Sequence, residues 1–317
     1  MSLDVVSTEP KTSIEGGISK DDEELEGLVK HVKAVFDNFT ETTTVEEMRA
    51  GWETLFHGTV PVVNATQEKV KTPLFQAEWI TAPEAEQDRV IVYLHGGGYV
   101  IGSVESYRDY SERLSRAAKA RVLFVEYRLA PENPFPAAVD DAVHAYRWVL
   151  AQGIKPDRVA IAGDSAGAAL AMSVMFTAKD AGDPLPACAV PISPWVDLEH
   201  TAKTFETLDC VEAMCHKSVL NGCAQLYLGD DRRNPLASSI HGDFTDLPPI
   251  FVTVGSHETL LDDALQLVDK AKAAGVITEL QIYDRQIHVF QIFASRMAAA
   301  ERAIHDIGRF IITYTSY

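Results

Sequence analysis

Nine residues in the middle of the chain read Val159-Ala160-Ile161-Ala162-Gly163-Asp164-Ser165-Ala166-Gly167. The first four are apolar, as in a buried strand, and an alanine-rich helical stretch begins at Ala166. A turn this sharp forces its central residue into strained dihedrals. It also needs small residues two positions to either side, so that the helix can pass close to the strand. We therefore expect Ser165 to project above a β-sheet at the N-terminus of a helix.

The Gly-x-Ser-x-Gly pattern has little weight by itself, because ordinary residue usage gives a random match in about one chain in ten of this length. Its place between a strand and a helix is what favours a catalytic serine. The alternative is a packing contact between small residues that has no chemical role.

A second glycine-rich stretch, His95-Gly96-Gly97-Gly98-Tyr99, follows an apolar run that ends at Leu94. Consecutive glycines let bare backbone approach a ligand and direct N–H groups at it, which is how an oxyanion hole is built. Chance gives His-Gly-Gly-Gly in about two of a thousand such chains, so this is the strongest single motif. A phosphate-binding loop is the rival interpretation, but no Gly-Lys-Ser/Thr follows and no helix begins directly after it.

Strand-like and helix-like segments alternate on both sides of these motifs. Such alternation is typical of a parallel sheet with helices on both faces. We expect strands near 74–80, 89–94, 122–125, 159–162, 188–192, 250–254 and 279–283, and helices near 137–150, 166–178, 260–274 and 289–310.

Two segments stand apart from this alternation. It breaks off for about 45 residues after Trp195, where residues 205–228 have helical spacing, so we expect an insertion there. Near the N-terminus, apolar residues recur at helical spacing from Leu25 to Phe36, which predicts an amphipathic helix that must cover another part of the protein.

Three candidate acids follow the strand expected at 250–254. Glu258 sits at the C-terminal tip of the strand, where loops that face a substrate lie. Asp262 and Asp263 fall in the first turn of the next helix, where they favour the helix dipole. Glu258 is the preferred acid, and the two aspartates remain alternatives.

One histidine, His288, follows the last expected strand and precedes the final helix. A lone histidine is more often structural than catalytic. Here its position completes the order Ser165, Glu258, His288 along the chain, which this sheet topology requires of a serine–acid–histidine triad.

Length and charge limit the protein's class. One α/β domain with an inserted segment can reach 317 residues. The 28 basic and 46 acidic residues give a net charge of −18, which repels phosphate backbones and anionic lipid, so we expect no nucleic-acid partner. The start of the chain lacks a secretion signal, and no apolar run approaches the roughly 18 residues of a spanning helix. We expect a cytoplasmic protein without stable membrane insertion.

The four cysteines are too few for a disulfide scaffold in a chain of this length, so reduced thiols are expected. Cys210, Cys215, His216 and Cys223 suggest a zinc site by their clustering. They lack the paired Cys-x-x-Cys spacing of structural zinc sites, so we prefer small buried residues on helices and expect no metal.

Together these motifs make the chain resemble the hormone-sensitive-lipase-like branch of the α/β hydrolases, which includes many microbial carboxylesterases. The resemblance covers roughly residues 74–310. It rests on both glycine-rich motifs and on three further segments, Tyr127-Arg128-Leu129-Ala130-Pro131-Glu132-Asn133-Pro134-Phe135-Pro136-Ala137, Asn234-Pro235-Leu236-Ala237-Ser238 and Ile287-His288-Val289-Phe290.

The resemblance implies an α/β-hydrolase fold, with a mostly parallel central sheet of about eight strands flanked by helices. The catalytic core would comprise residues 57–196 and 241–317. Residues 1–56 and 197–240 would form a discontinuous helical cap, which gives the amphipathic N-terminal helix a surface to cover.

The resemblance also implies roles for individual residues. The triad would be Ser165, Glu258 and His288, and the oxyanion would be held by the N–H groups of Gly97, Gly98 and Ala166. The family usually has Asp where Glu258 stands. Glu is longer by one methylene, so the histidine or its loop must shift.

Four other residues receive weaker assignments. Tyr99 and Trp195 are expected at the mouth of the substrate pocket. Arg128 and Glu132 are expected to form a partly buried pair that braces the oxyanion loop.

The function implied is a serine carboxylesterase that hydrolyses short- to medium-chain acyl esters of small molecules through an acyl-enzyme, without metal or organic cofactor. An amidase or lactonase would use the same machinery. A ligand-binding receptor on this scaffold is the third possibility, but such receptors lack the catalytic histidine, whereas His288 is present. Similar proteins are often dimers through the last strand and helix, so the resemblance allows a homodimer.

Overall fold

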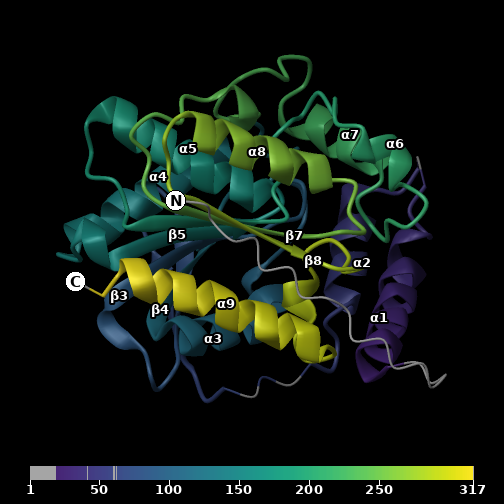
Figure 1. The fold of residues 1–317 in the computed structure, drawn as a ribbon, viewed down its shortest axis with the longest axis horizontal. Coiled ribbons are helices and arrows are strands. Elements are labelled where there is room, and N and C mark those ends of the chain that lie inside the picture. Colours follow the sequence, from purple (N-terminus) through teal and green to yellow (C-terminus); the bar gives the residue numbers. More distant parts are fainter. Residues whose placement is uncertain (1–18, 41, 60, 62, 317) are drawn as a thin grey trace, which may run out of the picture.

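The computed structural model describes residues 19–40, 42–59, 61 and 63–316. At its centre is one sheet with the strand order β1-β2-β4-β3-β5-β6-β7-β8 (Figure 1). β2 runs antiparallel to β1 and β4, and all other neighbours are parallel, which confirms the expected α/β-hydrolase sheet. The strands are β1 (Thr66–Lys71), β2 (Gln76–Thr81), β3 (Glu86–Leu94), β4 (Ala120–Glu126), β5 (Val159–Asp164), β6 (Cys188–Ile192), β7 (Ile250–Gly255) and β8 (Thr278–Tyr283).

The two central strands, β3 and β5, lie side by side in parallel, with Leu94 opposite Gly163. Residues 90–94 of β3 and 159–163 of β5 are apolar because strands of a parallel sheet are covered on both faces, and every residue of β5 is buried. Since they run in the same direction, the loops that follow Leu94 and Asp164 emerge at the same edge of the sheet.

Helices cover both faces of the sheet (Figure 1). One face carries α3 (Val104–Ala118) and α9 (Ala298–Tyr314), and the other carries α4 (Ala137–Ala151), α5 (Ala166–Ala181) and α8 (Leu261–Ala273). Within the described part of the chain, no helix is long and apolar enough to cross a bilayer.

Four helices gather at one end of the sheet: α1 (Lys20–Phe36), α2 (Val45–Thr54), α6 (Thr204–Thr207) and α7 (Lys217–Tyr227) (Figure 1). α1 is amphipathic as expected, with Leu25, Leu28 and Val32 buried. The helical stretch expected over 205–228 is instead two helices joined by a loop. In this loop the N–H groups of residues 213–215 bond to the Glu212 side chain rather than to helical carbonyls.

Arg49 fastens α2 to the core. Its guanidinium donates to the carbonyls of Val100 (2.9 Å) and Ala130 (3.0 Å), and it forms a two-bonded ion pair with Glu132 (2.7 and 2.8 Å). The α2 helix is thereby joined to the chain that follows the glycine loop.

The expected pairing of Arg128 with Glu132 is wrong. Arg128 pairs with Asp141 at 2.7 Å, and Glu132 pairs with Arg49. Both residues have partners of opposite charge, but Asp141 lies on α4 and Arg49 lies on α2.

α1 is held to the core differently, by ion pairs near its exposed N-terminal turn. Asp21 pairs with Arg302 at 2.6 Å, and Asp22 pairs with Arg285. Glu24 accepts a hydrogen bond from the N–H of Ala298 at the start of α9 (2.8 Å).

The turn from β5 into α5 shows why small residues surround Ser165. A Cβ on Gly163 would lie 2.3 Å from the Gly167 carbonyl oxygen, and a Cβ on Gly167 would lie 1.9 Å from the Leu94 carbonyl oxygen. Both distances are far below van der Waals contact, so backbone atoms occupy the space that any larger residue requires. The first turn of α5 therefore rests directly on the end of β3.

This packing predicts opposite effects for two glycine-to-alanine substitutions. Gly167→Ala forces a methyl group into backbone atoms and should lower the free energy of unfolding by about 3 kcal/mol or more. Gly27→Ala, at an exposed position of α1 with no atom within 4 Å of the new methyl group, should raise it by about 0.5–1 kcal/mol. Urea unfolding measures both, and equal stabilities of Gly167→Ala and wild type would contradict the proposed packing.

Candidate active site

Ser165 occupies the sharp turn between β5 and α5. Its backbone has φ 54° and ψ −118°, a strained combination for a residue with a side chain. The turn is held by hydrogen bonds from its N–H to the Ile192 carbonyl (2.9 Å) and from the Trp195 N–H to its carbonyl (3.2 Å). Ser165 therefore stands at the N-terminus of α5, where the helix dipole favours negative charge.

Glu258 and His288 come from the loops that follow β7 and β8. The His288 Nδ1 atom lies 2.8 Å from Glu258 Oε2, and both side chains are buried. Because the two strands are parallel neighbours, their loops leave the sheet together, and the N–H of His257 bonds to the Gln286 carbonyl (3.1 Å). The longer side chain of Glu thus reaches the imidazole directly.

The second oxygen of Glu258 is also occupied. Its Oε1 accepts hydrogen bonds from the Ser193 hydroxyl (2.8 Å) and from the N–H of Gly255. Ser193 Oγ in turn accepts the N–H of Val289, next to His288 (3.2 Å). Ser193 was not expected from the sequence, where its position just after β6 is the only sign of a role at this edge.

Burial and pairing shift the pKa values of this group. Burial raises the pKa of Glu258, and the hydrogen bond with His288 opposes that rise. Burial alone would lower the pKa of His288, but Cys215 and Glu258 beside the ring outweigh it and raise this pKa well above 6.5. Burial raises the pKa of the Cys215 thiol, and the His288 imidazole beside it lowers that pKa.

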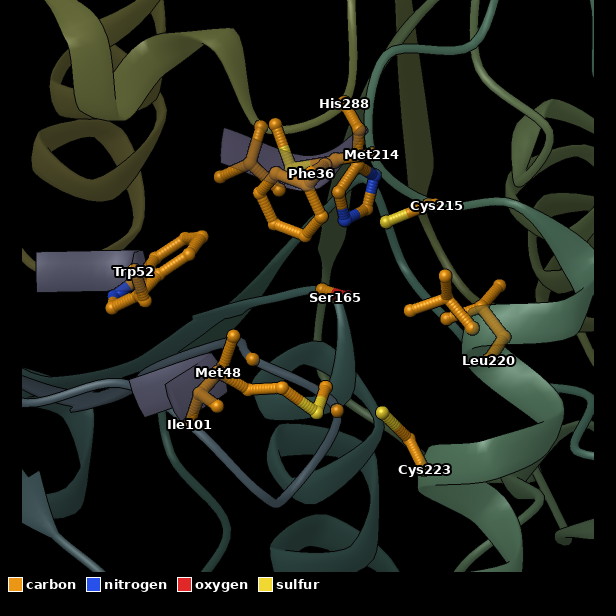
Figure 2. A pocket seen from close by; sticks show the side chains of 14 residues that line it. Phe36, Met48, Trp52, Ile101, Ser165, Met214, Cys215, Leu220, Cys223 and His288 are labelled. Atoms are coloured by element: carbon orange, nitrogen blue, oxygen red, sulfur yellow. The ribbon is translucent and has the colours of Figure 1, made fainter. Parts of the chain in front are cut away.

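Ser165 and His288 line one cavity, and their side chains face each other across it (Figure 2). Among the hydrogen bonds of the described residues, none joins Ser165 Oγ to the imidazole. Hydrogen bonds between catalytic groups are often long in the absence of substrate and shorten when it binds. The structure thus brings Ser165, Glu258 and His288 to one place, with Glu258 and His288 in direct contact.

The glycine loop lies on the other side of Ser165. Gly97 and Gly98 have φ values of 101° and 59°, and a Cβ on Gly98 would lie 2.7 Å from Cys223 Sγ, so only glycine fits this loop. In the described structure neither Gly97 N–H nor Gly98 N–H donates a hydrogen bond to another residue. Two donors beside the serine are therefore free for a ligand.

Asp164, next to the serine, joins the turn to the glycine loop. Its buried carboxylate accepts hydrogen bonds from the hydroxyls of Tyr93 and Tyr107 (2.7 Å each) and from the N–H of Gly96 (3.0 Å). Burial raises the pKa of Asp164 to about 6, although the tyrosine hydrogen bonds lower it.

The cavity in front of Ser165 has a volume of about 40 Å³, room for a few water molecules. Its walls are almost entirely apolar (Figure 2). They come from the N-terminal helices (Phe36, Met48, Trp52), the glycine loop (Gly97, Gly98, Ile101), the serine and histidine loops (Ser165, His288, Val289) and the insertion (Met214, Cys215, Val219, Leu220, Cys223).

Tyr99 and Trp195 do not line this cavity, contrary to expectation. Both are fully buried beneath the site. The Tyr99 ring stacks on Tyr227 with centroids 3.7 Å apart, and the Trp195 ring stacks on His200 at 5.6 Å. The aromatic residues after the strand ends are therefore core residues.

The alternative acids bind backbone rather than the histidine. Asp263 Oδ2 accepts the N–H groups of Val196 and Asp197 (2.9 and 3.1 Å), and Asp262 Oδ2 accepts those of Lys203 and Thr204 (3.1 and 3.3 Å). Both aspartates thus hold the start of the insertion against α8.

The cysteines considered for zinc do not form one cluster. Cys215 and Cys223 line the cavity, Cys210 is exposed, and His216 pairs with Asp209 at 3.0 Å.

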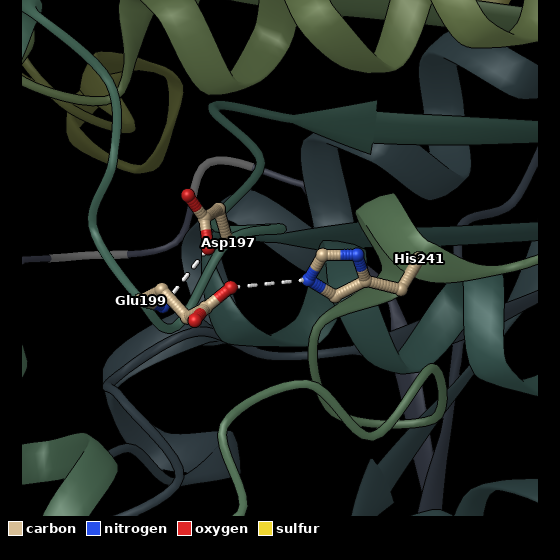
Figure 3. Close-up of side chains that lie close together, drawn as sticks. All are labelled: Asp197, Glu199 and His241. Carbon is tan, nitrogen blue, oxygen red and sulfur yellow. Dashed lines mark hydrogen bonds and ion pairs between the residues drawn. The ribbon is translucent and has the colours of Figure 1, made fainter.

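A different group, Asp197, Glu199 and His241, has ligand atoms within 4.8 Å of one another (Figure 3). The Asp197 carboxylate accepts the N–H groups of Glu199 and Thr201, both at 2.9 Å. Glu199 Oε2 lies 3.5 Å from His241 Nε2 and 3.6 Å from the guanidinium of Arg233. The carboxylates already have protein donors and a cation beside them, so we interpret this group as an ion-pair network outside the cavity.

Comparisons with known proteins agree with this site. The sequence pattern of the alpha/beta hydrolase fold family matches residues 91–292. The chain is 45% identical over 240 residues to an acetyl-hydrolase of Streptomyces hygroscopicus, covering 75% of this chain and 80% of that protein. It is 33% identical over 229 residues to an esterase of Acinetobacter venetianus, covering 72% and 76%.

Among solved structures, the fold is similar to that of an esterase from the bacterial hormone-sensitive lipase family. The TM-score is 0.89 at 41% sequence identity, and the match covers 92% of this chain and 98% of that one. A family pattern matches most of the chain, its relatives are ester hydrolases, and a serine faces a carboxylate–histidine pair. The chain therefore belongs to the hormone-sensitive-lipase-like esterases of the α/β-hydrolase fold family and is a carboxylic ester hydrolase.

Proposed function

We propose that Ser165 is the nucleophile of this ester hydrolase, His288 its general base and Glu258 the acid that orients the base. The observation that carries this proposal is the 2.8 Å contact between Glu258 and His288 Nδ1, with the imidazole facing Ser165 across the cavity. The contact leaves Nε2 as the ring nitrogen that accepts the serine proton.

In the first half of the reaction, Ser165 Oγ bonds to the carbonyl carbon of the ester while its proton passes to His288 Nε2. The tetrahedral intermediate collapses by breaking the bond to the alcohol oxygen, and His288 returns the proton to that leaving group. Water then repeats the attack on the acyl-enzyme, with His288 again taking and returning one proton. Acid and regenerated serine are the products.

The N–H groups of Gly97, Gly98 and Ala166 would hold the negative oxygen of both tetrahedral intermediates. The free N–H groups of the glycine loop and the place of Ala166 at the start of α5 support this role. Each such donor stabilises the transition state by about 3 kcal/mol. The strained dihedrals of Ser165 place its hydroxyl in front of them.

The acyl group would be a short chain of dissolved, small-molecule esters. The apolar cavity of about 40 Å³ accommodates a few carbon atoms, and longer chains require wall residues to move. Residues 1–56 and 197–240 would act as a cap over this cavity, because Phe36, Met48 and Trp52 come from one segment and Leu220 from the other. Residues 1–18 of this cap lie outside the described residues.

A panel of p-nitrophenyl esters tests the nucleophile and the chain length together. The wild-type protein should hydrolyse the acetate and butyrate esters with a higher kcat/KM than the palmitate ester. Ser165→Ala should lose about 10⁴-fold or more in kcat on every ester. Ser218→Ala, an exposed serine on α7, is the matched control and should match wild type. Equal rates for Ser165→Ala and wild type would end the proposal.

The pH dependence of kcat/KM tests the base. His288 acts as a base only when neutral, so the rate should fall as the pH drops through its pKa. Because Cys215 and Glu258 hold that pKa well above 6.5, the midpoint of the fall should also lie above 6.5. Assays of p-nitrophenyl acetate hydrolysis from about pH 5 to about pH 9 measure it. A rate that stays constant down to the lowest pH would exclude His288 as the base.

We propose that the partner is a second copy of this chain, which binds at the free edge of β8 to form a homodimer. Among the strands of the described residues, β8 has only β7 beside it, and Ile277 and Ile282 in or next to this edge are 60% and 41% exposed. A second copy could extend the sheet there about a two-fold axis.

Light scattering tests this dimer through the particle mass. Wild type should have twice the chain mass of 34.8 kDa, and Ile282→Lys, which puts a charge on the edge, should have the mass of one chain. Leu74→Lys changes an exposed apolar residue near the opposite edge and should remain dimeric. Wild type at the mass of one chain at micromolar concentration would refute the dimer.

A further inference from the structure

Glu212 is a fully buried carboxylate in the loop between α6 and α7 that the proposed mechanism does not use. Its Oε1 accepts the N–H groups of Ala213 (2.8 Å), Met214 (3.0 Å) and Cys215 (3.2 Å). Its Oε2 accepts the N–H of Thr259 (2.9 Å) and lies 3.4 Å from the Thr259 hydroxyl oxygen. All four backbone partners are N–H donors, so both oxygens act as acceptors, as in an ionised carboxylate.

Thr259 follows the acid Glu258 directly, and all its polar groups bond to the insertion. Besides the N–H bond to Glu212, its hydroxyl donates to the Cys215 carbonyl (2.6 Å) and its carbonyl accepts from the Thr204 hydroxyl (2.6 Å). The backbone that carries Glu258 is therefore fixed from the insertion as well as from the end of β7.

The same three-residue segment that Glu212 holds also reaches the base. Cys215 makes a side-chain hydrogen bond with the His288 imidazole, and its thiol lies beside the ring (Figure 2). Met214 and Cys215 are both walls of the cavity. The Glu212 carboxylate thus has one oxygen on the segment that touches the base and the other on the residue next to the acid.

We propose that Glu212 is a positioning residue for the acid–base pair: through Thr259 it sets the place of Glu258, and through Cys215 it sets that of His288. This inference rests on the proposed roles of Ser165, Glu258 and His288. It makes the insertion a part of the catalytic apparatus as well as a wall of the cavity.

The charge of Glu212 gives this role a signature. The charged and titratable groups around His288 are Glu258 from the acid loop, Cys215 from the insertion and Asp164 from the serine turn, and the charge of Glu212 raises the pKa of Glu258. A negative charge near the pair favours the protonated imidazole. Its removal should lower the pKa of His288, so the acid-side fall of kcat/KM should move to lower pH.

Glu212→Gln tests this with p-nitrophenyl acetate as substrate. It keeps the size of the side chain but removes the charge and puts an amide N–H₂ against N–H donors. We expect kcat to fall about 10- to 100-fold and the acid-side midpoint to move down by about half a pH unit. Asp262→Asn is the matched control, because Asp262 also accepts two insertion N–H groups but lies away from the imidazole, and its midpoint should equal that of wild type.

Thermal unfolding of each variant shows whether a loss of activity comes from a loss of the fold or from displacement of Glu258 and His288. If Glu212→Gln does not fold, Thr259→Val provides the test, because it keeps the shape and the charge but removes the hydroxyl that bonds to the Cys215 carbonyl and lies beside Glu212. It should lower kcat at least about tenfold. A wild-type kcat in folded Thr259→Val, or a wild-type midpoint in folded Glu212→Gln, would overturn the positioning role.

These outcomes are distinct from failure of the proposed function. Active wild type with variants that match it would refute the role of Glu212 and leave the triad in place. If Ser165→Ala were as active as wild type, both the proposed triad and the proposed role of Glu212 would be refuted.

Discussion

The contact between Gly167 and the end of β3 is the constraint on which the rest of the site depends. The first turn of α5 lies against the carbonyls of Leu94 and His95 so closely that no side chain fits between them. This contact fixes the serine turn, which precedes α5, relative to the glycine loop, which begins at His95. The positions of Ser165 and of the glycine-loop N–H groups opposite it are thus set by backbone packing rather than by side-chain conformation.

Around this contact, buried carboxylates hold the site together through N–H and O–H donors rather than through arginine. In the described structure Asp164, Glu212, Glu258 and Asp263 are at most 1% exposed, and none pairs with Lys or Arg. Asp164 and Glu258 each accept N–H or O–H groups from two segments distant in the sequence, and Glu212 and Asp263 each accept them from one. A buried carboxylate is stable only where such donors replace its water, so each one requires its loops to be in register.

The sequence predicted the parts of the site that depend on backbone constraints and on the order of strands. Ser165 and the glycine loop follow from residue sizes that the turns demand, and Glu258 and His288 follow from their places after β7 and β8. Partners across the fold were not predictable, because no local pattern encodes them. For this reason the hydrogen bond of Ser193 to Glu258 was missed, and Glu132 was expected to pair with Arg128 instead of with Arg49. Tyr99 was expected at the mouth of the pocket, but its ring is covered by Tyr227.

The two N-terminal helices above the cavity are attached by contacts of different kinds. α2 is joined through Arg49 to backbone carbonyls and through Trp52 to the buried hydroxyl of Ser106 (3.0 Å), whereas the exposed end of α1 is joined through pairs such as Asp21 with Arg302. Dissolved ions screen exposed pairs strongly and buried hydrogen bonds hardly at all. Concentrated salt would therefore weaken the attachment of the α1 N-terminal turn, while the buried Leu25, Leu28 and Val32 of α1 and the Trp52–Ser106 hydrogen bond of α2 still hold both helices in place.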